Sequence, residues 1–197
     1  RKADKAMYEA KRAGGNGARL YEPLMEVRAA RRAAIETDLP RALEAEQLWL
    51  AYQPRFALAA LAILGGEALL RWNHPALGAV RPDEFIKIAE RNRSILPIGR
   101  WVIEQAAAEL SRWRRAGAAA GLRVSVNVSP IQLLDRDFVR GLTDALVDAQ
   151  LPPQQLEIEI TESIMLERTR EVSENLRALT ELGVGIAIDD FGTGYSS

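Results

Sequence analysis

The sequence predicts an α/β protein built on a parallel sheet. Segments rich in Val and Ile alternate with segments whose apolar residues recur at helical spacing, and this alternation is typical of strands joined by crossover helices. The strand-like segments "LRVSVNVSP", "LEIEITES" and "GVGIAIDD" are nearly continuously apolar, as strands buried on both faces usually are. Hydrophobic residues make up 48% of the 197 residues, which is enough for a sizeable core.

The first 46 residues are predicted to be mostly helical. The segment "ADKAMYEAKRAGGNG" has apolar residues at helical spacing and then several glycines, which predicts the end of an amphipathic helix. A short strand is expected in "ARLYEP". Residues 23–46 are helical in pattern and rich in Arg, Ala and Glu, and we interpret them as a solvated linker helix. Pro40 is expected to kink or restart this helix, with Thr37 or Asp38 as the cap.

From residue 47 onward, strands and helices follow one another. The segments "LWLAYQPRFAL" and "AILGGEALLRW" are predicted to be the first two strands. Two helices, at 83–91 and 97–116, are expected before the strand "LRVSVNVSP". A helix in "DFVRGLTDALVDAQ" then leads to "LEIEITES", and a helix at 168–182 leads to "GVGIAIDD".

Composition excludes several classes of partner and site. The net charge is −1, from 26 basic and 27 acidic residues, so nothing favours binding to a nucleic-acid polymer or an anionic membrane. The chain has no cysteine, which excludes disulfides and thiolate zinc sites and is compatible with the cytoplasm, where we expect the protein to act. The most apolar stretch, Ala57 to Leu64, is too short to span a bilayer; a membrane anchor in a preceding region remains compatible with this.

Acid and amide side chains lie near the carboxyl ends of four predicted strands. Side chains alternate along a strand, so Asn127, Glu159 and Asp189 lie opposite the Val or Ile residues, which should face the helices. The polar faces would then converge at the carboxyl-terminal end of the sheet, where sites are usually built in parallel α/β proteins. The groups are Glu67, Asn127, Glu159, and Asp189 with Asp190.

Carboxylates gathered in this way repel one another unless cations neutralise them. Hard oxygen ligands suit magnesium or manganese. Two such ions can hold a phosphodiester and activate a water for in-line attack. Arg71 lies on the same strand face as Glu67 and would hold a phosphate oxygen through its forked donors.

Each of these residues also has a purely structural interpretation. Glu67 can cap a helix, Asn127 can satisfy backbone groups in a loop, and Asp189 with Asp190 can form an Asx turn before Gly192. Glu157 and Glu162 can be surface acids. The presence of such groups on four successive strands favours a metal site over these separate structural roles. The single histidine, His74, is interpreted as structural, and Trp72, Trp101 and Trp113 as core residues.

Five motifs then resemble those of one family in order and approximate spacing. They are "YQP", "GGEALLRWNHP" with its Glu67-Ala68-Leu69, "SVNVSPIQL", "EIEITES" and "DDFGTGYSS". Together they resemble EAL domains, bacterial phosphodiesterases that hydrolyse the second messenger cyclic di-GMP. The resemblance covers residues 36–197 and implies a TIM-like (β/α)8 barrel whose first strand runs opposite to the others.

The start of the chain resembles a different family. "ADKAMYEAKRAGGN" is similar to the final helix of a GGDEF, or diguanylate cyclase-like, domain, although Gly15 stands where that family usually has arginine. The cyclase signature itself is not in this sequence, so no cyclase activity is assigned. We expect residues 1–22 to be the tail of a GGDEF-like domain, residues 23–46 a linker helix, and residues 47–197 the N-terminal part of an EAL domain.

The EAL resemblance also implies roles for individual residues. Glu67, Asp189 and Asp190 would be catalytic. The ligands of two Mg²⁺ or Mn²⁺ ions would be Glu67, Asn127, Glu159 and Asp189, with Asp190 close to the metals.

Further positions would bind the substrate or support the site. Gln53 and Arg71 would contact cyclic di-GMP. Glu162 would support the loop "DFGTGYSS", which in the family couples the metals, the substrate and a homodimer interface.

Only about five of the eight barrel strands precede Ser197, so we expect the chain to be a slice of a longer GGDEF–EAL protein. In the family, later strands supply a lysine and a further glutamate needed for metal binding and water activation. We therefore expect this chain alone to be inactive, with an unpaired edge at its last strand and apolar surface exposed inside the open barrel.

Two functional hypotheses follow. The first is that the parent protein is a phosphodiesterase that cleaves cyclic di-GMP to linear pGpG. The alternative is a catalytically degenerate EAL domain that acts as a cyclic di-GMP receptor or regulatory interaction module.

Overall fold

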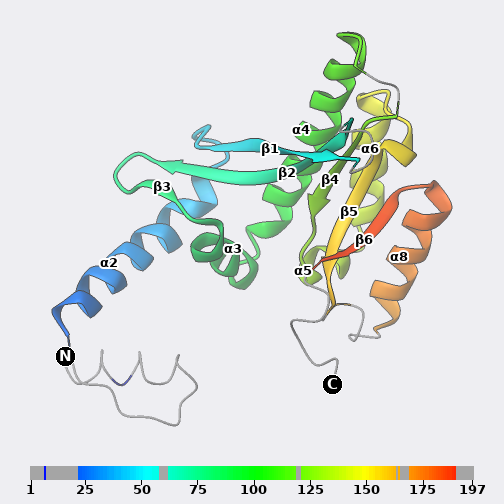
Figure 1. Cartoon of the computed structure of the whole chain (residues 1–197). Helices are drawn as coiled ribbons and strands as arrows, with labels where there is room; N and C mark the ends of the chain where they lie inside the picture. Colours follow the sequence, from blue (N-terminus) through cyan, green and yellow to red (C-terminus); the bar gives the residue numbers. More distant parts are fainter. Residues whose placement is uncertain are drawn as a thin grey trace.

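The structure is a computed structural model and describes residues 22–57, 62–118, 121–162, 164 and 169–189, together with Met7. The predicted N-terminal helix, most of "ARLYEP", Asp190 and the loop after it lie outside these residues. A six-stranded mixed sheet and the helices packed on it make up most of the described part of the chain (Figure 1).

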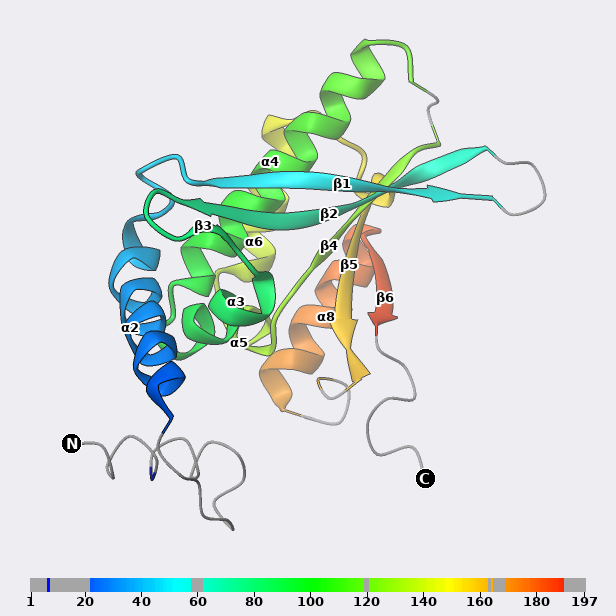
Figure 2. The same ribbon diagram turned by 60° about the vertical axis from the view of Figure 1, so that its left-hand side comes forward.

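The sheet runs in the order β1-β2-β4-β5-β6, and β3 pairs separately with β2. β1 is antiparallel to β2, whereas β2, β4, β5 and β6 run parallel (Figure 2). The predicted parallel sheet with a reversed first strand is therefore confirmed. The strands of this path are β1 (Leu48–Phe56), β2 (Ile63–His74), β4 (Arg123–Asn127), β5 (Leu156–Thr161) and β6 (Gly185–Asp189).

Helices pack against the Val- and Ile-rich face of the strands, as predicted. Val124, Val126 and Ile158 are fully buried. α4 contacts β1, β2 and β4, α8 contacts β6, and α6 packs against both α4 and α8 (Figures 1 and 2). The helices on this side are α3 (Pro82–Arg91), α4 (Ile95–Arg115), α5 (Pro130–Leu133), α6 (Phe138–Asp148) and α8 (Arg170–Leu182).

Short elements account for most differences from the predicted boundaries. α4 begins at Ile95 rather than at 97, because Pro97 lies in the first helical turn, where a missing N–H breaks no helical hydrogen bond. The four-residue α5 and the 3₁₀ turn η2 (Pro153–Gln155) were not predicted. None of the helices in the described part of the chain is both long and apolar enough to cross a bilayer.

A hairpin after β2 was also missed by the sequence analysis. β3 (Gly78–Val80) pairs antiparallel with the end of β2. His74 closes this hairpin: its Nδ1 accepts hydrogen bonds from the backbone N–H groups of Ala76 and Leu77, each at 3.1 Å. Its Nε2 therefore carries the proton and donates to Asp38 at 2.9 Å. The side chain is buried, so the structural interpretation of His74 is confirmed.

The segment before β1 is helical and is interrupted at Pro40, as predicted, but no side-chain cap forms there. α2 (Pro23–Asp38) passes into the 3₁₀ turn η1 (Leu39–Arg41), which contains Pro40. Asp38 is the N-cap residue of η1, as one of the two predicted alternatives had it, but its side chain accepts from His74 instead of capping. The Thr37 hydroxyl donates to the Ala33 carbonyl.

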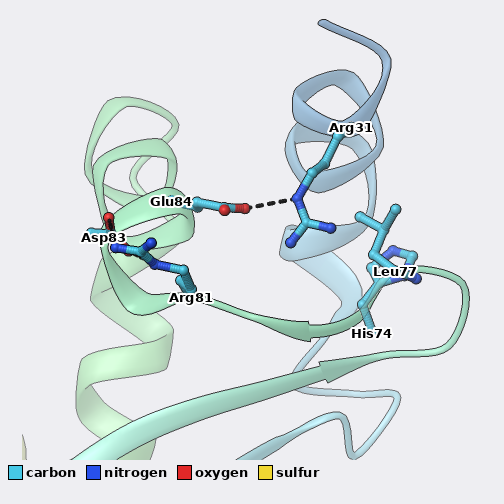
Figure 3. Close-up of polar contacts among 6 residues, drawn as sticks. All are labelled: Arg31, His74, Leu77, Arg81, Asp83 and Glu84. Carbon is cyan, nitrogen blue, oxygen red and sulfur yellow. Dashed lines mark hydrogen bonds and ion pairs between the residues drawn. The ribbon is translucent and has the colours of Figure 1, made fainter. Parts of the chain in front are cut away.

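Nor is this segment simply a solvated linker. Ile35, Leu39 and Ala42 belong to the hydrophobic core. Figure 3 shows Arg31 of α2 reaching Glu84 of α3, where the guanidinium Nε lies 2.9 Å from a carboxylate oxygen. The C-terminal half of α2 is therefore docked onto the body of the fold.

Glycine permits the close approach of β2 and β4. A Cβ at Gly65 would lie 1.8 Å from the backbone oxygen of Arg123 in β4, a distance that no side chain tolerates. The absence of a side chain at this position lets the parallel pairing run from Gly65 to Ala68. That pairing sets the register in which Glu67 meets β4.

Candidate functional site

One face of the sheet gathers the predicted site residues. Cross-strand partners share a face, and residues two apart along a strand do too. Gln53 lies opposite Glu67, Glu67 opposite Ser125, and Asn127 opposite Glu159. Polar groups from four consecutive strands of the sheet path, β1, β2, β4 and β5, therefore share the face that lies away from the Val and Ile core.

Glu67 and Asn127 are in direct contact. The Asn127 amide nitrogen Nδ2 donates a hydrogen bond of 2.8 Å to Glu67 Oε1. Since the amide group donates toward Glu67, its oxygen Oδ1 is the atom left to bind a cation. The backbone beside it is also fixed, because the Val128 N–H donates to the Glu159 carbonyl at 2.9 Å.

Glu159 is the most deeply buried of the predicted ligands that the structure describes. Its side chain is 3% exposed, whereas Asn127 is exposed and Glu67 is partly buried. Arg55 of β1 donates to Glu159 through Nη2, and through Nη1 to Glu157 Oε1 at 2.9 Å. The guanidinium of Arg55, which comes from the edge strand β1, thus neutralises the buried carboxylate of Glu159.

Asp189 lies on the same face but further along the strands. In the β5–β6 register, Glu159 is opposite Ala187 and Asp189 is opposite Thr161. Asp189 is therefore displaced by two residues, one repeat of the strand, from the row that contains Asn127 and Glu159. Its side chain is exposed, and Asp190 lies outside the described residues.

The two predicted substrate-binding residues share the face of Glu67, with Gln53 on β1 and Arg71 further along β2. Gln53 is the cross-strand partner of Glu67 and is exposed. Arg71 is partly buried, lies opposite Trp49, and donates from Nη1 to the Leu70 carbonyl at 3.0 Å. Glu162, the predicted support of the loop, is partly buried just after β5. The loop itself lies beyond the described residues.

An aromatic cluster anchors β1 beside these residues. The Tyr52 ring packs edge-on against Trp113 of α4, with centroids 4.9 Å apart, and the Trp113 indole N–H donates to Glu109 at 2.7 Å. Burial, together with the negative charge of Glu109, raises the pKa of Tyr52 well above its ordinary value of 10.0. Hydrogen bonding from Arg112 lowers the pKa of Glu109 below its ordinary value.

A family model described as the EAL domain matches residues 36–197. The chain belongs to the EAL domain family. The predicted family is therefore confirmed. The described sheet matches the structures of EAL domains, which are TIM-like barrels, so the predicted fold class is confirmed as well.

Curated EAL relatives match almost the whole chain. It is 40% identical over 195 residues to the bifunctional diguanylate cyclase/cyclic di-GMP phosphodiesterase MucR of Pseudomonas aeruginosa, covering 99% of this chain and 28% of MucR. It is 36% identical over 197 residues to the cyclic di-GMP phosphodiesterase PdeR of Escherichia coli, covering 100% of this chain and 29% of PdeR. The chain thus spans less than a third of the length of either relative.

Solved EAL structures show the same fold. A MucR phosphodiesterase in complex with c-di-GMP superimposes with a TM-score of 0.78 at 39% identity, covering 83% of this chain and 66% of that one. The EAL enzyme Bd1971 in its cAMP- and cyclic-di-GMP-bound form superimposes with a TM-score of 0.77 at 34% identity, covering 96% of this chain and 49% of that one.

We call the face that carries Glu67, Asn127 and Glu159 the EAL mouth. Its chemistry suits a hard divalent cation. Glu67, Asn127 and Glu159 offer the oxygen ligands that Mg²⁺ and Mn²⁺ prefer. The Ser125 hydroxyl, in register with Glu67, is buried and has no hydrogen-bond partner in the described part of the chain, so a hydrated ion would supply one. Within the same part, no three His, Cys, Asp or Glu side chains form a metal-holding group. The predicted set of metal ligands also includes Asn127, whose amide is not one of those four residue types, and Asp190, which lies outside the described residues.

Sequence reasoning missed Arg55 and misjudged Glu157. Glu157 was interpreted as a possible surface acid, but it lies on the face of the EAL mouth and pairs with Arg55. The alternation of β1 carried the signal, because Arg55 is two residues after Gln53 and so shares its face. The alternation does not reveal that Arg55 contacts Glu157 and Glu159 of β5.

Proposed function

We propose that, in its full-length protein, this EAL domain hydrolyses cyclic di-GMP to linear pGpG. The observation that carries the proposal is the group formed by Glu67, Asn127 and Glu159 on one face of three adjacent parallel strands, with the first two hydrogen-bonded at 2.8 Å. The names of MucR and PdeR, both called cyclic di-GMP phosphodiesterases, support the same substrate.

The proposed roles follow from the donor types. Two Mg²⁺ or Mn²⁺ ions, when bound, would activate a water and stabilise charge on the phosphodiester. The residues proposed to hold these ions are Glu67, Asn127, Glu159, Asp189 and Asp190. Asn127 would orient the Glu67 carboxylate through the hydrogen bond that it already donates.

Substrate positioning is assigned to Gln53 and Arg71, which share the face of Glu67. Arg71 can offer two parallel N–H donors to one phosphate, which fixes both position and orientation. Gln53, exposed opposite Glu67, would hydrogen-bond the dinucleotide. Glu162 would support the loop that follows β6.

The longer protein is also part of the proposal. Residues 1–22 would be the tail of a GGDEF-like domain; the match to MucR, named as bifunctional, extends over 99% of the chain and so beyond the EAL match. We propose that the EAL domain acts as a homodimer in the cytoplasm, and that residues 1–197 alone do not turn over substrate.

The test is an assay of the full-length protein with cyclic di-GMP and Mn²⁺, in which the release of pGpG is followed by chromatography. We expect linear pGpG to appear and EDTA to abolish it. Binding of cyclic di-GMP without any pGpG would overturn the proposal in favour of a receptor. Equilibrium binding of cyclic di-GMP, measured in the presence of EDTA, separates a loss of chemistry from a loss of binding.

A further inference from the structure

The Arg55 side chain crosses the face of the sheet to reach β5. Three strand spacings separate β1 from β5 in the order β1-β2-β4-β5, about 14 Å if the sheet were flat. Arg55 is in register with Gly65 and Arg123, which precede the residues of β4 that pair with Glu157 and Glu159. The side chain must therefore also reach along the strands, and the contact requires the sheet to curl. Arg55 is paired in register with Gly65, and a glycine places no side chain in the way.

The two carboxylates that Arg55 contacts differ in burial. Glu159 is 3% exposed and Glu157 is 21% exposed, while Arg55 itself is 43% exposed. A buried carboxylate is costly unless it is neutralised. The Arg55 guanidinium therefore supplies Glu159 with the charge compensation that a divalent ion would otherwise supply.

We propose that Arg55 is a positioning residue that sets the divalent-cation affinity of the EAL mouth by competing with the ion for Glu159. This inference rests on the proposed metal site. A cation bound to Glu159 and a guanidinium bound to the same carboxylate repel each other. Ion binding to Glu159 is therefore weaker while Arg55 holds this carboxylate.

Glu157 provides the alternative partner. It lies two residues before Glu159 on the same strand face and already accepts a hydrogen bond from Arg55 Nη1 at 2.9 Å. It is not one of the residues proposed to hold the ions. A small movement of the guanidinium toward Glu157 would free Glu159 and keep the arginine charge paired.

The experiment is a titration of full-length protein with Mn²⁺ in the absence of cyclic di-GMP, in which free Mn²⁺ is measured by electron paramagnetic resonance. Charge-assisted hydrogen bonds are among the stronger polar contacts, so we expect Arg55→Gln to lower the Mn²⁺ dissociation constant about tenfold. Glu157→Gln removes the alternative partner and should raise the constant about threefold.

Two further variants separate this role from a structural one. Arg55→Lys keeps the charge and should restore the dissociation constant most of the way toward wild type. Arg81→Gln removes an exposed arginine that pairs with Asp83 near the start of α3 and should leave Mn²⁺ binding unchanged. Circular dichroism of every variant tests whether it folds; if Arg55→Gln does not, the Arg55→Lys and Glu157→Gln titrations decide.

An unchanged or weaker affinity for Mn²⁺ in Arg55→Gln would overturn the inference. So would a change in cyclic di-GMP affinity with the Mn²⁺ constant unaltered, because Arg55 would then be a substrate contact. The absence of Mn²⁺ binding in every variant would overturn it too. Failure of the proposed hydrolysis is measured separately by pGpG release, so a receptor that binds Mn²⁺ with the expected order of affinities would still support the inference.

Discussion

The α2–α3 junction and the mouth at the strand ends are both built from arginines and carboxylates, but they differ in exposure and charge balance. At the junction, Arg31 and Glu84 are 33% and 35% exposed, and acids and bases lie side by side along the helices. At the mouth, carboxylates and an amide converge, and Glu159 is almost fully buried.

Burial determines what such a cluster can do. An exposed pair gains little, because water screens both charges whether or not they meet. A buried carboxylate must find a cation, and at the mouth that cation is a protein guanidinium or, by our proposal, a metal ion. The ion pairs at the junction thus add only a little to the packing of α2 on α3. The acidic and amide groups at the mouth are instead suited to binding a cation.

The largest expected effect is at the mouth. Glu67→Ala removes a proposed metal ligand, and because loss of residues that merely support ligands already costs 10- to 100-fold, we expect kcat/KM of the full-length protein to fall by more than about 100-fold. Glu84→Gln at the junction should change it little. The measurement is pGpG release with Mn²⁺, and equal losses in the two variants would remove the functional distinction between the regions.

His74 tests whether burial, rather than location, sets the strength of a polar contact. It lies beside the junction, but it is buried and its Nδ1 accepts two backbone hydrogen bonds. His74→Ala would leave both N–H groups without that acceptor, so we expect it to lower the free energy of unfolding by about 1–3 kcal/mol. His74→Asn places an oxygen near Nδ1 and should lose less. Urea denaturation of the three proteins makes the comparison, and equal losses in the two variants would argue against the acceptor role.

Tyr52 extends the comparison to pH. Its pKa is raised in the folded state, chiefly by burial, so its contribution to stability is complete below the unfolded pKa of about 10 and is lost as the pH rises above that value. After allowance for solvent screening, we expect wild type to lose at most about 1 kcal/mol more than Tyr52→Phe between pH 8 and pH 11. Urea denaturation at both pH values measures this, and identical pH dependence in the two proteins would contradict it.

The smallest effect is expected for the partly exposed Arg31–Glu84 pair of the junction. Arg31→Gln should lower the free energy of unfolding by only about 0.2–1 kcal/mol, and 1 M salt should reduce the difference, because it screens exposed charges. A loss as large as that of His74→Ala, or one insensitive to salt, would show that the junction is held by its ion pairs rather than by Ile35 and Leu39 in the core.

Several features could be predicted from the sequence, because they follow from local rules. The Val–X–Val and Ile–X–Ile alternation of β4 and β5 placed Asn127 and Glu159 on the polar face, and the structure shows their Val and Ile neighbours in the core. β3 could not be predicted in this way, because its three residues are too few to show a strand period. The solvated interpretation of α2 failed because its apolar residues are sparse and only their packing partners reveal that they are buried.

The sequence by itself determined the type and order of the main elements, the reversal of the first strand through family resemblance, and the faces on which Glu67, Asn127 and Glu159 lie. The element types and the faces are set by residues close together in the chain, and the reversal by the order of motifs along it. Only the tertiary structure decided that Arg55 meets Glu157 and Glu159, 102 and 104 residues away. That contact depends on the register of four strands and the curvature of the sheet, and these arise only when the core packs.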